Sequence, residues 1–264
     1  MLVPVEGAPA MLLRLRRERV LVVADLHLGV ESSLVEEGLS LPSQTPKVRD
    51  RLMDLISAHS PDRLVMLGDV KHNVPISSWQ EWRELPSLFD ELSKLVEVDV
   101  VKGNHDGGLE GMLPKGVRIQ GPRGITIGER SRIGLMHGHT WPSAELMRAK
   151  VILAGHNHPA VEFRDELGGR VVVPVWLRCP INADGLPPSL KKSVKGKAPK
   201  LVVLPAFGEL IGGTPVNREM PEELIGPVFK SRAARIEEAE AYTLDGTFLG
   251  KVKNISPNMP MKAR

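Results

Sequence analysis

Four of the eight histidines in this 264-residue chain lie in two short stretches, at 137–139 (His-Gly-His) and 156–158 (His-Asn-His). Each stretch follows an apolar run of strand length, so the imidazoles are expected at strand ends. Three polar clusters earlier in the chain also end apolar runs: Asp25-Leu26-His27, Gly68-Asp69 and Gly103-Asn104-His105-Asp106. Strand ends are therefore where carboxylates, an amide and imidazoles gather.

This combination of side chains is suited to binding divalent transition metals. Carboxylate oxygens and imidazole nitrogens without sulfur favour Mn²⁺, Fe²⁺ or Zn²⁺ over Cu(I) or an iron–sulfur cluster. The donors are too many for one tetrahedral ion, whereas two ions about 3.5–4 Å apart that share one carboxylate would use them. A paired site of this kind polarises a phosphoryl oxygen and holds a hydroxide for in-line attack.

The elements that must position these donors begin with strands and helices in alternation. Apolar runs at 19–27, 62–73 and 96–106 predict strands, and 46–60 and 77–95 predict helices between them, the second broken or kinked at Pro86. This order predicts a largely parallel sheet. Since the carboxyl ends of parallel strands form one crevice, the following residues should converge: Asp25, His27, Asp69, Asn104 and His105.

The pattern of the sequence changes after residue 110. Short β-type runs follow one another, and only 142–150 looks helical, which predicts antiparallel sheet with hairpins that closes a second layer. No internal repeat or linker divides the sequence. We therefore expect one α/β domain over residues 1–250 and a flexible tail over 251–264.

Composition limits the classes of protein and partner. Hydrophobic residues make up 42% of the chain but aromatic residues only 4%, so the core must rest on Val, Leu and Ile. A net charge of +3 permits a nucleic-acid partner without requiring one. The single Cys179 excludes an internal disulfide and a thiolate cluster. No run approaches the ~20 apolar residues of a membrane span, and the N-terminus is unlike a signal peptide, so we expect a cytoplasmic protein with no membrane partner.

The ordered motifs between residues 25 and 158 resemble those of a known family. They read Asp-x-His, Gly-Asp-x-x-His, Gly-Asn-His-Asp, His-Gly-His and Gly-His-x-His, and this set resembles the calcineurin-like metallophosphoesterase superfamily. The resemblance implies a two-sheet β-sandwich of mixed sheets flanked by helices. "ADLHLGVE", "LGDVKHN" and "LVVLPAFGELIGGTPVN", within 19–217, look most similar to the archaeal SbcD-related phosphoesterases and to those encoded beside a DNA ligase.

The resemblance also implies a role for each motif residue. One metal ion would be held by Asp25, His27, Asp69 and His158. The other would be held by Asp69, Asn104, His137 and His156. Asp69 would bridge the two ions, and Mn²⁺ is the expected metal, with Fe²⁺ or Zn²⁺ as alternatives. His105 would face the scissile phosphate and stabilise the transition state or protonate the leaving oxygen, while His139 would only neighbour the site.

His72 departs from the pattern of the protein phosphatases in this superfamily. Those enzymes have an aspartate at this spacing after the bridging Asp, whereas SbcD-type nucleases have a histidine beside the catalytic one. We therefore predict a catalytic His72 next to His105, and a phosphodiesterase or nuclease that acts in DNA metabolism or repair. The alternatives are a small-molecule phosphomonoesterase, a nucleotide phosphodiesterase, and a metal-containing docking module of a DNA-repair assembly. A homodimer and a nucleic-acid contact by the lysine-rich loop 187–200 are left open.

Overall fold

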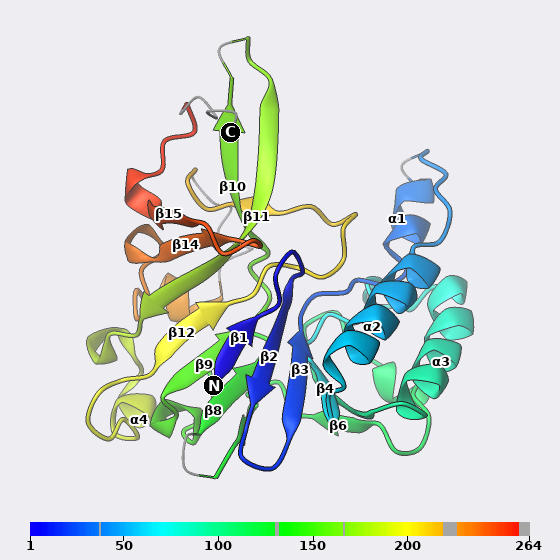
Figure 1. The fold of residues 1–264 in the computed structure, drawn as a ribbon, viewed down its shortest axis with the longest axis horizontal. Helices are drawn as coiled ribbons and strands as arrows, with labels where there is room; N and C mark the ends of the chain where they lie inside the picture. The colour runs from blue at the N-terminus through cyan, green and yellow to red at the C-terminus, as the bar shows by residue number, and fades with distance from the viewer. Residues whose placement is uncertain (37, 130–131, 166, 219–225, 259–264) are drawn as a thin grey trace.

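Two β-sheets pack face to face, and the helices α2 (Thr45–His59) and α3 (Trp79–Ser93) cover the outer face of the first sheet (Figure 1). The computed structural model describes residues 1–36, 38–129, 132–165, 167–218 and 226–258. The predicted two-sheet sandwich of mixed sheets flanked by helices is confirmed. Among the described residues, no helix is long and apolar enough to cross a membrane.

The first sheet has six strands in sequence order. They are β1 (Leu2–Pro4), β2 (Ala10–Arg14), β3 (Arg19–Val23), β4 (Arg63–Met66), β5 (Glu97–Val101) and β6 (Arg118–Gln120). The pairs β1–β2 and β2–β3 are antiparallel, and all pairs from β3 to β6 are parallel. The carboxyl ends of β3, β4 and β5 therefore lie together at one edge, as the strand–helix alternation predicts.

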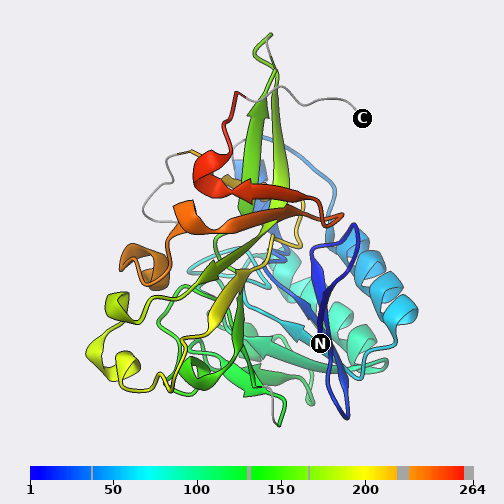
Figure 2. The ribbon, with the colours of Figure 1, turned by 60° about the vertical axis from the view of Figure 1, so that its left-hand side comes forward.

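In the described part of the chain, the second sheet has nine strands, seven of them in the order β13-β10-β11-β12-β9-β8-β7. These are β7 (Ile125–Ile127), β8 (Ile133–Met136), β9 (Val151–Ala154), β10 (Pro159–Arg164), β11 (Arg170–Pro180), β12 (Lys200–Val203) and β13 (Thr214–Pro215). Strand β14 (Glu240–Thr243) pairs with β11, and β15 (Phe248–Lys251) pairs with β14. The β10–β11 hairpin projects beyond the sandwich in both views (Figures 1 and 2).

The helices are few and short outside the first half. They are α1 (Val30–Glu36), α2 (Thr45–His59), α3 (Trp79–Ser93), α4 (Pro188–Lys191) and α5 (Pro227–Lys230). Single 3₁₀ turns occur at η1 (Leu109–Gly111), η2 (Leu146–Arg148), η3 (Ala183–Gly185), η5 (Ile236–Glu238) and η6 (Val252–Asn254). Helix α3 runs through Pro86 without ending there.

Strand β3 shows why the first sheet is buried on both faces. Val20 and Val22 belong to the core between the two sheets, together with Trp176 of β11. Leu21 and Val23 point the other way, into the core under α2 and α3. Successive side chains of a strand face opposite sides, so a continuous apolar run is what a strand between two layers requires.

The second half differs from the expectation of antiparallel sheet. Its centre is parallel, since β8 pairs in parallel with β9, and β9 in parallel with β12. The segment 142–150, expected as a helix, contains only the turn η2 (Leu146–Arg148). The connection from Met136 to Val151 is nevertheless long enough to return the chain to the start of a parallel neighbour. Because of this, the two histidine motifs follow adjacent parallel strands.

The end of the chain is partly packed. Within the segment expected as a tail, Lys251 ends β15, and Val252 and Ile255 are buried in the core on the outer face of the second sheet. Residues 259–264 lie outside the described residues.

Leu52 tests the packing of α2 against the first sheet. It is fully buried, so Leu52→Ala removes apolar contacts and leaves a cavity. We expect urea unfolding to show a loss of about 2–5 kcal/mol in the free energy of unfolding. Leu95→Ala, at an exposed leucine after α3, should stay within about 0.5 kcal/mol of the unaltered chain. Equal effects of the two changes would contradict this packing.

Candidate metal centre

The motif residues all follow the carboxyl ends of parallel strands, in both sheets. Asp25 and His27 follow β3, Asp69 follows β4, and Asn104 and His105 follow β5. From the second sheet, His137 follows β8, while His156 and His158 follow β9. The seam between the two sheets therefore brings together residues that are up to 133 positions apart in the chain, from 25 to 158.

The backbone of this cluster is held in an unusual conformation. Seven described residues other than glycine have a positive φ, and five of them belong to the cluster. These five are Asp25 (56°), His27 (47°), Asp69 (46°), His156 (72°) and His158 (41°). Left-handed backbone is uncommon for residues with a side chain and persists where the surrounding structure enforces it. The left-handed conformation turns the chain where each strand ends, so that the side chain points toward the cluster.

Asp25, His27 and His158 form one group whose ligand atoms could hold a metal ion. Nε2 of His27 lies 3.3 Å from Nε2 of His158, which lies 3.5 Å from Oδ1 of Asp25. Asp25 also accepts the backbone N–H of His156, at 2.9 Å from Oδ2. This hydrogen bond joins the carboxylate of the first sheet to the loop that carries two histidines of the second sheet.

Asp69, His137 and His156 form a second such group, beside Asn104. Nε2 of His137 is 3.4 Å from Oδ2 of Asp69 and 3.1 Å from Oδ1 of Asn104. Nδ1 of His137 is 2.8 Å from the carbonyl oxygen of Leu67, to which it donates. That hydrogen bond fixes the ring and leaves Nε2 facing the group, as in histidines that bind metals.

Asp69 lies between the two groups. Its Oδ2 is 3.5 Å from Nε2 of His27 in the first group and 3.4 Å from Nε2 of His137 in the second. Its Oδ1 accepts the backbone N–H of His105 at 2.8 Å. One carboxylate therefore contacts both groups and also anchors the loop that carries His105.

Burial and the carboxylates together set the protonation of the cluster. Burial, aided by the charge of neighbouring histidines, lowers the pKa of His27 to about 2 and that of His156 to about 3. Burial also opposes protonation of His137, but its hydrogen bond to Asp69 and the charges of Asp25 and Asp69 raise its pKa to about 9. Burial raises the pKa of Asp69 as well, yet His137 and His27 hold it well below its usual value. The low pKa values leave His27 and His156 neutral, and neutral imidazoles beside the buried side chains of Asp25 and Asp69 fit a divalent cation. His137 would give up a proton on binding the ion.

The rings of His72 and His105 lie side by side. Their centroids are 5.5 Å apart at an interplanar angle of 28°, and Nδ1 of His105 contacts the carbonyl oxygen of His72. Nδ1 of His72 lies 3.1 Å from Nδ1 of His27, and His27, His72 and His105 form a third group with ligand atoms close together. Burial, with the charge of His105, lowers the pKa of His72. His72 therefore contacts His27 of the first group and also His105.

His139 lies beside the second group. Its ring centroid is 5.1 Å from that of His137 and 6.1 Å from that of His156. Burial lowers its pKa to about 4, and within the described part of the chain its Nδ1 makes no hydrogen bond. It is a neighbour of the cluster and belongs to neither of the two groups.

Glu81 and Asp106 support the cluster, and the motif reasoning gave them no role. Oε1 of Glu81 accepts the backbone N–H of His72 at 2.9 Å and that of Asn73 at 2.8 Å. Asp106 accepts from Val70, at 2.9 Å, and from Gly103, at 2.8 Å. Glu81 was detectable in principle, because Ser78-x-x-Glu81 is a capping box at the start of α3.

Two glycines of the motifs lie very close to the side chains of the two aspartates. A Cβ on Gly103 would lie 2.2 Å from Oδ1 of Asp69, and one on Gly155 would lie 2.6 Å from Oδ2 of Asp25. Any side chain at either position would displace a buried carboxylate, so glycine is required there by the two aspartates.

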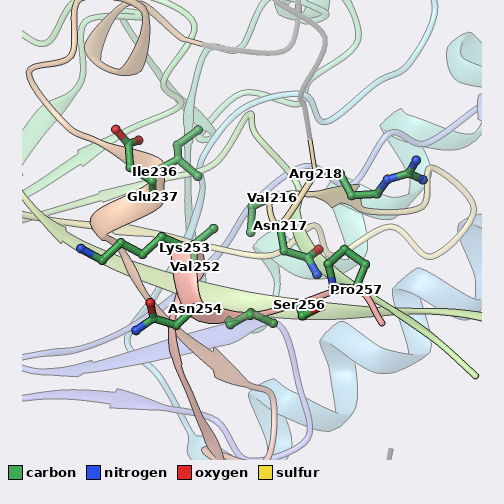
Figure 3. Close-up of a pocket in the computed structure, with 11 residues that line it drawn as sticks. Val216, Asn217, Arg218, Ile236, Glu237, Val252, Lys253, Asn254, Ser256 and Pro257 are labelled. Carbon is green, nitrogen blue, oxygen red and sulfur yellow. The ribbon is translucent and has the colours of Figure 1, made fainter. Parts of the chain in front are cut away.

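A cavity of about 600 Å³ lies outside the cluster (Figure 3). It is lined by Val216, Asn217, Arg218, Ile236, Glu237 and residues 252–257. Among the described residues of the lining, Arg218 and Lys253 outnumber the one carboxylate, Glu237, and no histidine is present. This cavity lacks the donors that a transition metal needs, so the strand-end cluster is the candidate site.

The sequence from residue 19 to residue 176 matches the calcineurin-like phosphoesterase superfamily domain. The chain therefore belongs to the calcineurin-like phosphoesterase superfamily, and it is a hydrolase that acts on ester bonds. Its fold is that of the metallophosphoesterases, a family that uses divalent metals. No curated protein matches the sequence.

Two solved structures are similar over most of their length. The nuclease MPE of Pseudomonas putida is 21% identical, with a TM-score of 0.49, and the match covers 93% of this chain and 98% of that one. The phosphoesterase YfcE of E. coli is 15% identical, with a TM-score of 0.41, over 88% of this chain and 97% of that one. Family membership rests on the sequence match.

Glu81→Gln tests the support of the His72 loop. An amide has one accepting oxygen, so either the N–H of Ser78 or the N–H groups of His72 and Asn73 lose their acceptor. We expect a loss of about 1–3 kcal/mol in the free energy of unfolding and faster hydrogen exchange at the amides of His72 and Asn73. Glu91→Gln, on the same helix, should change neither. Unchanged exchange in the Glu81 variant would contradict this role.

Proposed function

We propose that the chain is a two-metal phosphodiesterase, and specifically a nuclease of DNA metabolism. The position of Asp69 is the observation that carries the proposal. Its Oδ2 lies 3.5 Å from Nε2 of His27 and 3.4 Å from Nε2 of His137, so a single carboxylate reaches both groups of ligands. A shared carboxylate is the feature that holds two ions about 3.5–4 Å apart.

The proposed ligands follow the two groups. One ion is assigned to Asp25, His27, Asp69 and His158, and the other to Asp69, Asn104, His137 and His156. Mn²⁺ is the proposed metal, with Fe²⁺ or Zn²⁺ as alternatives, because oxygen and imidazole donors suit all three. When bound, such a pair supplies Lewis-acid polarisation of a phosphoryl oxygen and lowers the pKa of water. The burial of Asp25 and Asp69 and the lowered pKa values of His27 and His156 support this assignment.

His105 is proposed as the catalytic residue on the leaving-group side. Its backbone is anchored by Asp69, and its Nδ1–H donates to the carbonyl oxygen of His72. With Nδ1 engaged, Nε2 is the atom left for the substrate, and it carries a proton only when the ring is an imidazolium. In that state it donates to the leaving oxygen or to the phosphate.

His72 is proposed to act with His105 on the phosphate. Its ring stacks on that of His105, and its Nδ1 is paired with Nδ1 of His27. A histidine at this position adds no fixed negative charge, whereas a carboxylate there would hold His105 as the cation. This difference supports a phosphodiester substrate, and it supports the assignment to the SbcD-related and ligase-associated group.

Three alternatives remain for the same site. It would also suit a small phosphomonoester or a nucleotide-type diester, and a docking module of a DNA-repair assembly would keep the ligands with little turnover. Hydrolysis of single- and double-stranded DNA, RNA and small phosphoesters with Mn²⁺ separates these alternatives. We also propose a cytoplasmic location, which is supported by the single, buried Cys179. A homodimer, and a contact between nucleic acid and the lysine-rich loop 187–200, are left open.

Asp69→Asn tests the bridge. The amide keeps the size of the side chain but removes the charge shared by both ions, so both sites should lose metal together. We expect elemental analysis to find less than one ion per chain, and bis(nitrophenyl) phosphate hydrolysis to disappear. Asp54→Asn, at an exposed position of α2, should keep both ions. Two ions retained in the Asp69 variant would refute the assignment.

His105→Ala tests the acid role. The ring is not among the proposed ligands, so the variant should keep its metals but lose about 10²–10⁴-fold in turnover of diesters with alkyl leaving groups. The loss should be smaller for nitrophenyl diesters, whose leaving groups need no proton. His59→Ala, at the end of α2, serves as the matched control with unchanged turnover. Equal losses for both leaving groups would limit His105 to electrostatic stabilisation.

A further inference from the structure

Two of the four tryptophans of the chain are exposed on the first turn of α3. The exposed fraction is 78% for Trp79 and 52% for Trp82. Residues three apart lie on the same face of a helix, so the two indoles present one aromatic surface. The loop that leads into α3 adds the exposed side chains of Val74 and Ile76. Exposed apolar surface of this kind marks a site of interaction.

This surface is attached to both loops that carry the proposed catalytic histidines. Glu81, between the two tryptophans in sequence, accepts the backbone N–H of His72 and caps the helix through Ser78. The ring of Trp82 lies 3.3 Å from the position of a Cβ on Gly111, at the end of η1, which begins four residues after His105. The indoles are therefore fixed relative to His72 and His105.

The ring of Trp79 already accepts a planar cation. The guanidinium of Arg83 lies 5.6 Å from the ring centroid, and the arginine side chain is exposed. An indole face that accepts a flat, delocalised group also accepts a nucleobase. Arg83 is also paired with Glu84, at 2.9 Å between Nη2 and Oε1, so the argument for the ligand rests on the indoles and not on this charge.

We propose that Trp79 and Trp82 bind unpaired bases of a nucleic-acid substrate by stacking. The choice of ligand rests on the proposed function: the group that adjoins a scissile phosphodiester is a nucleoside, and this surface starts at Val74, two residues after His72, which is proposed to act on that phosphate. Bases inside a duplex are stacked on one another, so the surface selects single strands or frayed ends. Stacking on indoles is tolerant of sequence, and cleavage should then show little base preference.

Binding of two strands of equal charge tests the proposal. Labelled oligothymidylate and an abasic strand of the same length are titrated, by fluorescence anisotropy, with Mn²⁺-loaded His105→Ala protein. This variant should cleave the strand about 10²–10⁴-fold more slowly than the unaltered protein, and gel analysis after the titration checks that the strand is intact. The strand with bases should bind about five- to 150-fold more tightly for one stacked base. Trp79→Ala and Trp82→Ala should reduce this ratio towards one, and Trp→Phe at either position should preserve most of it. Phe248→Ala removes an exposed aromatic ring on β15 and should leave the ratio unchanged.

Several outcomes would overturn the proposal. These are equal affinity for the two strands, no binding of either strand, and a ratio that survives both Trp→Ala changes. Light scattering that shows a dimer in the unaltered protein and a monomer in the Trp variants would assign the surface to contact between copies of the chain. Failure of the proposed function is seen separately, as an unaltered protein that hydrolyses no phosphodiester while its preference for bases still depends on the tryptophans.

Discussion

Two buried carboxylates, Asp25 and Asp69, impose the constraint on which the rest of the site depends. Their exposed fractions are 0% and 2%, and an ionised group out of water is costly unless it is paired and hydrogen-bonded. Backbone N–H groups of His156 and His105 supply part of the compensation. Imidazoles supply another part through the raised pKa of His137. Divalent cations bound beside the carboxylates, as proposed above, would complete it.

The same constraint joins the two sheets. Asp25 follows a strand of the first sheet and accepts from a residue of the second, whereas His137 follows a strand of the second sheet and donates to a carbonyl oxygen of the first. Left-handed backbone at five cluster residues and the glycine at 103 allow these contacts at strand ends. The apolar core between the sheets holds the strain in place. The candidate site therefore lies at the interface between the two sheets, and its hydrogen bonds help to join them.

The sequence predicted those features of the structure that depend on a periodic or local pattern of residues. Strand–helix alternation predicted the parallel part of the first sheet, and polar residues after apolar runs predicted which side chains would converge. It was wrong about the parallel centre of the second sheet, because short apolar runs do not reveal which strands pair. The capping box marks Glu81 at the start of α3, but its contacts with the His72 loop, the support from Asp106 and the contact of His72 with His27 depend on loop conformations that no periodic pattern encodes. The convergence of the motif residues was thus predictable, whereas most of the contacts that position them were not.

Anomalous diffraction from crystals soaked in Mn²⁺ tests the central claim most directly, because it locates each ion without reference to activity. The account predicts two peaks about 3.5–4 Å apart, one on each side of the Asp69 carboxylate. The first should lie among Asp25, His27 and His158, and the second among Asn104, His137 and His156. A single peak held by His27, His72 and His105, or no peak at the seam between the sheets, would contradict it.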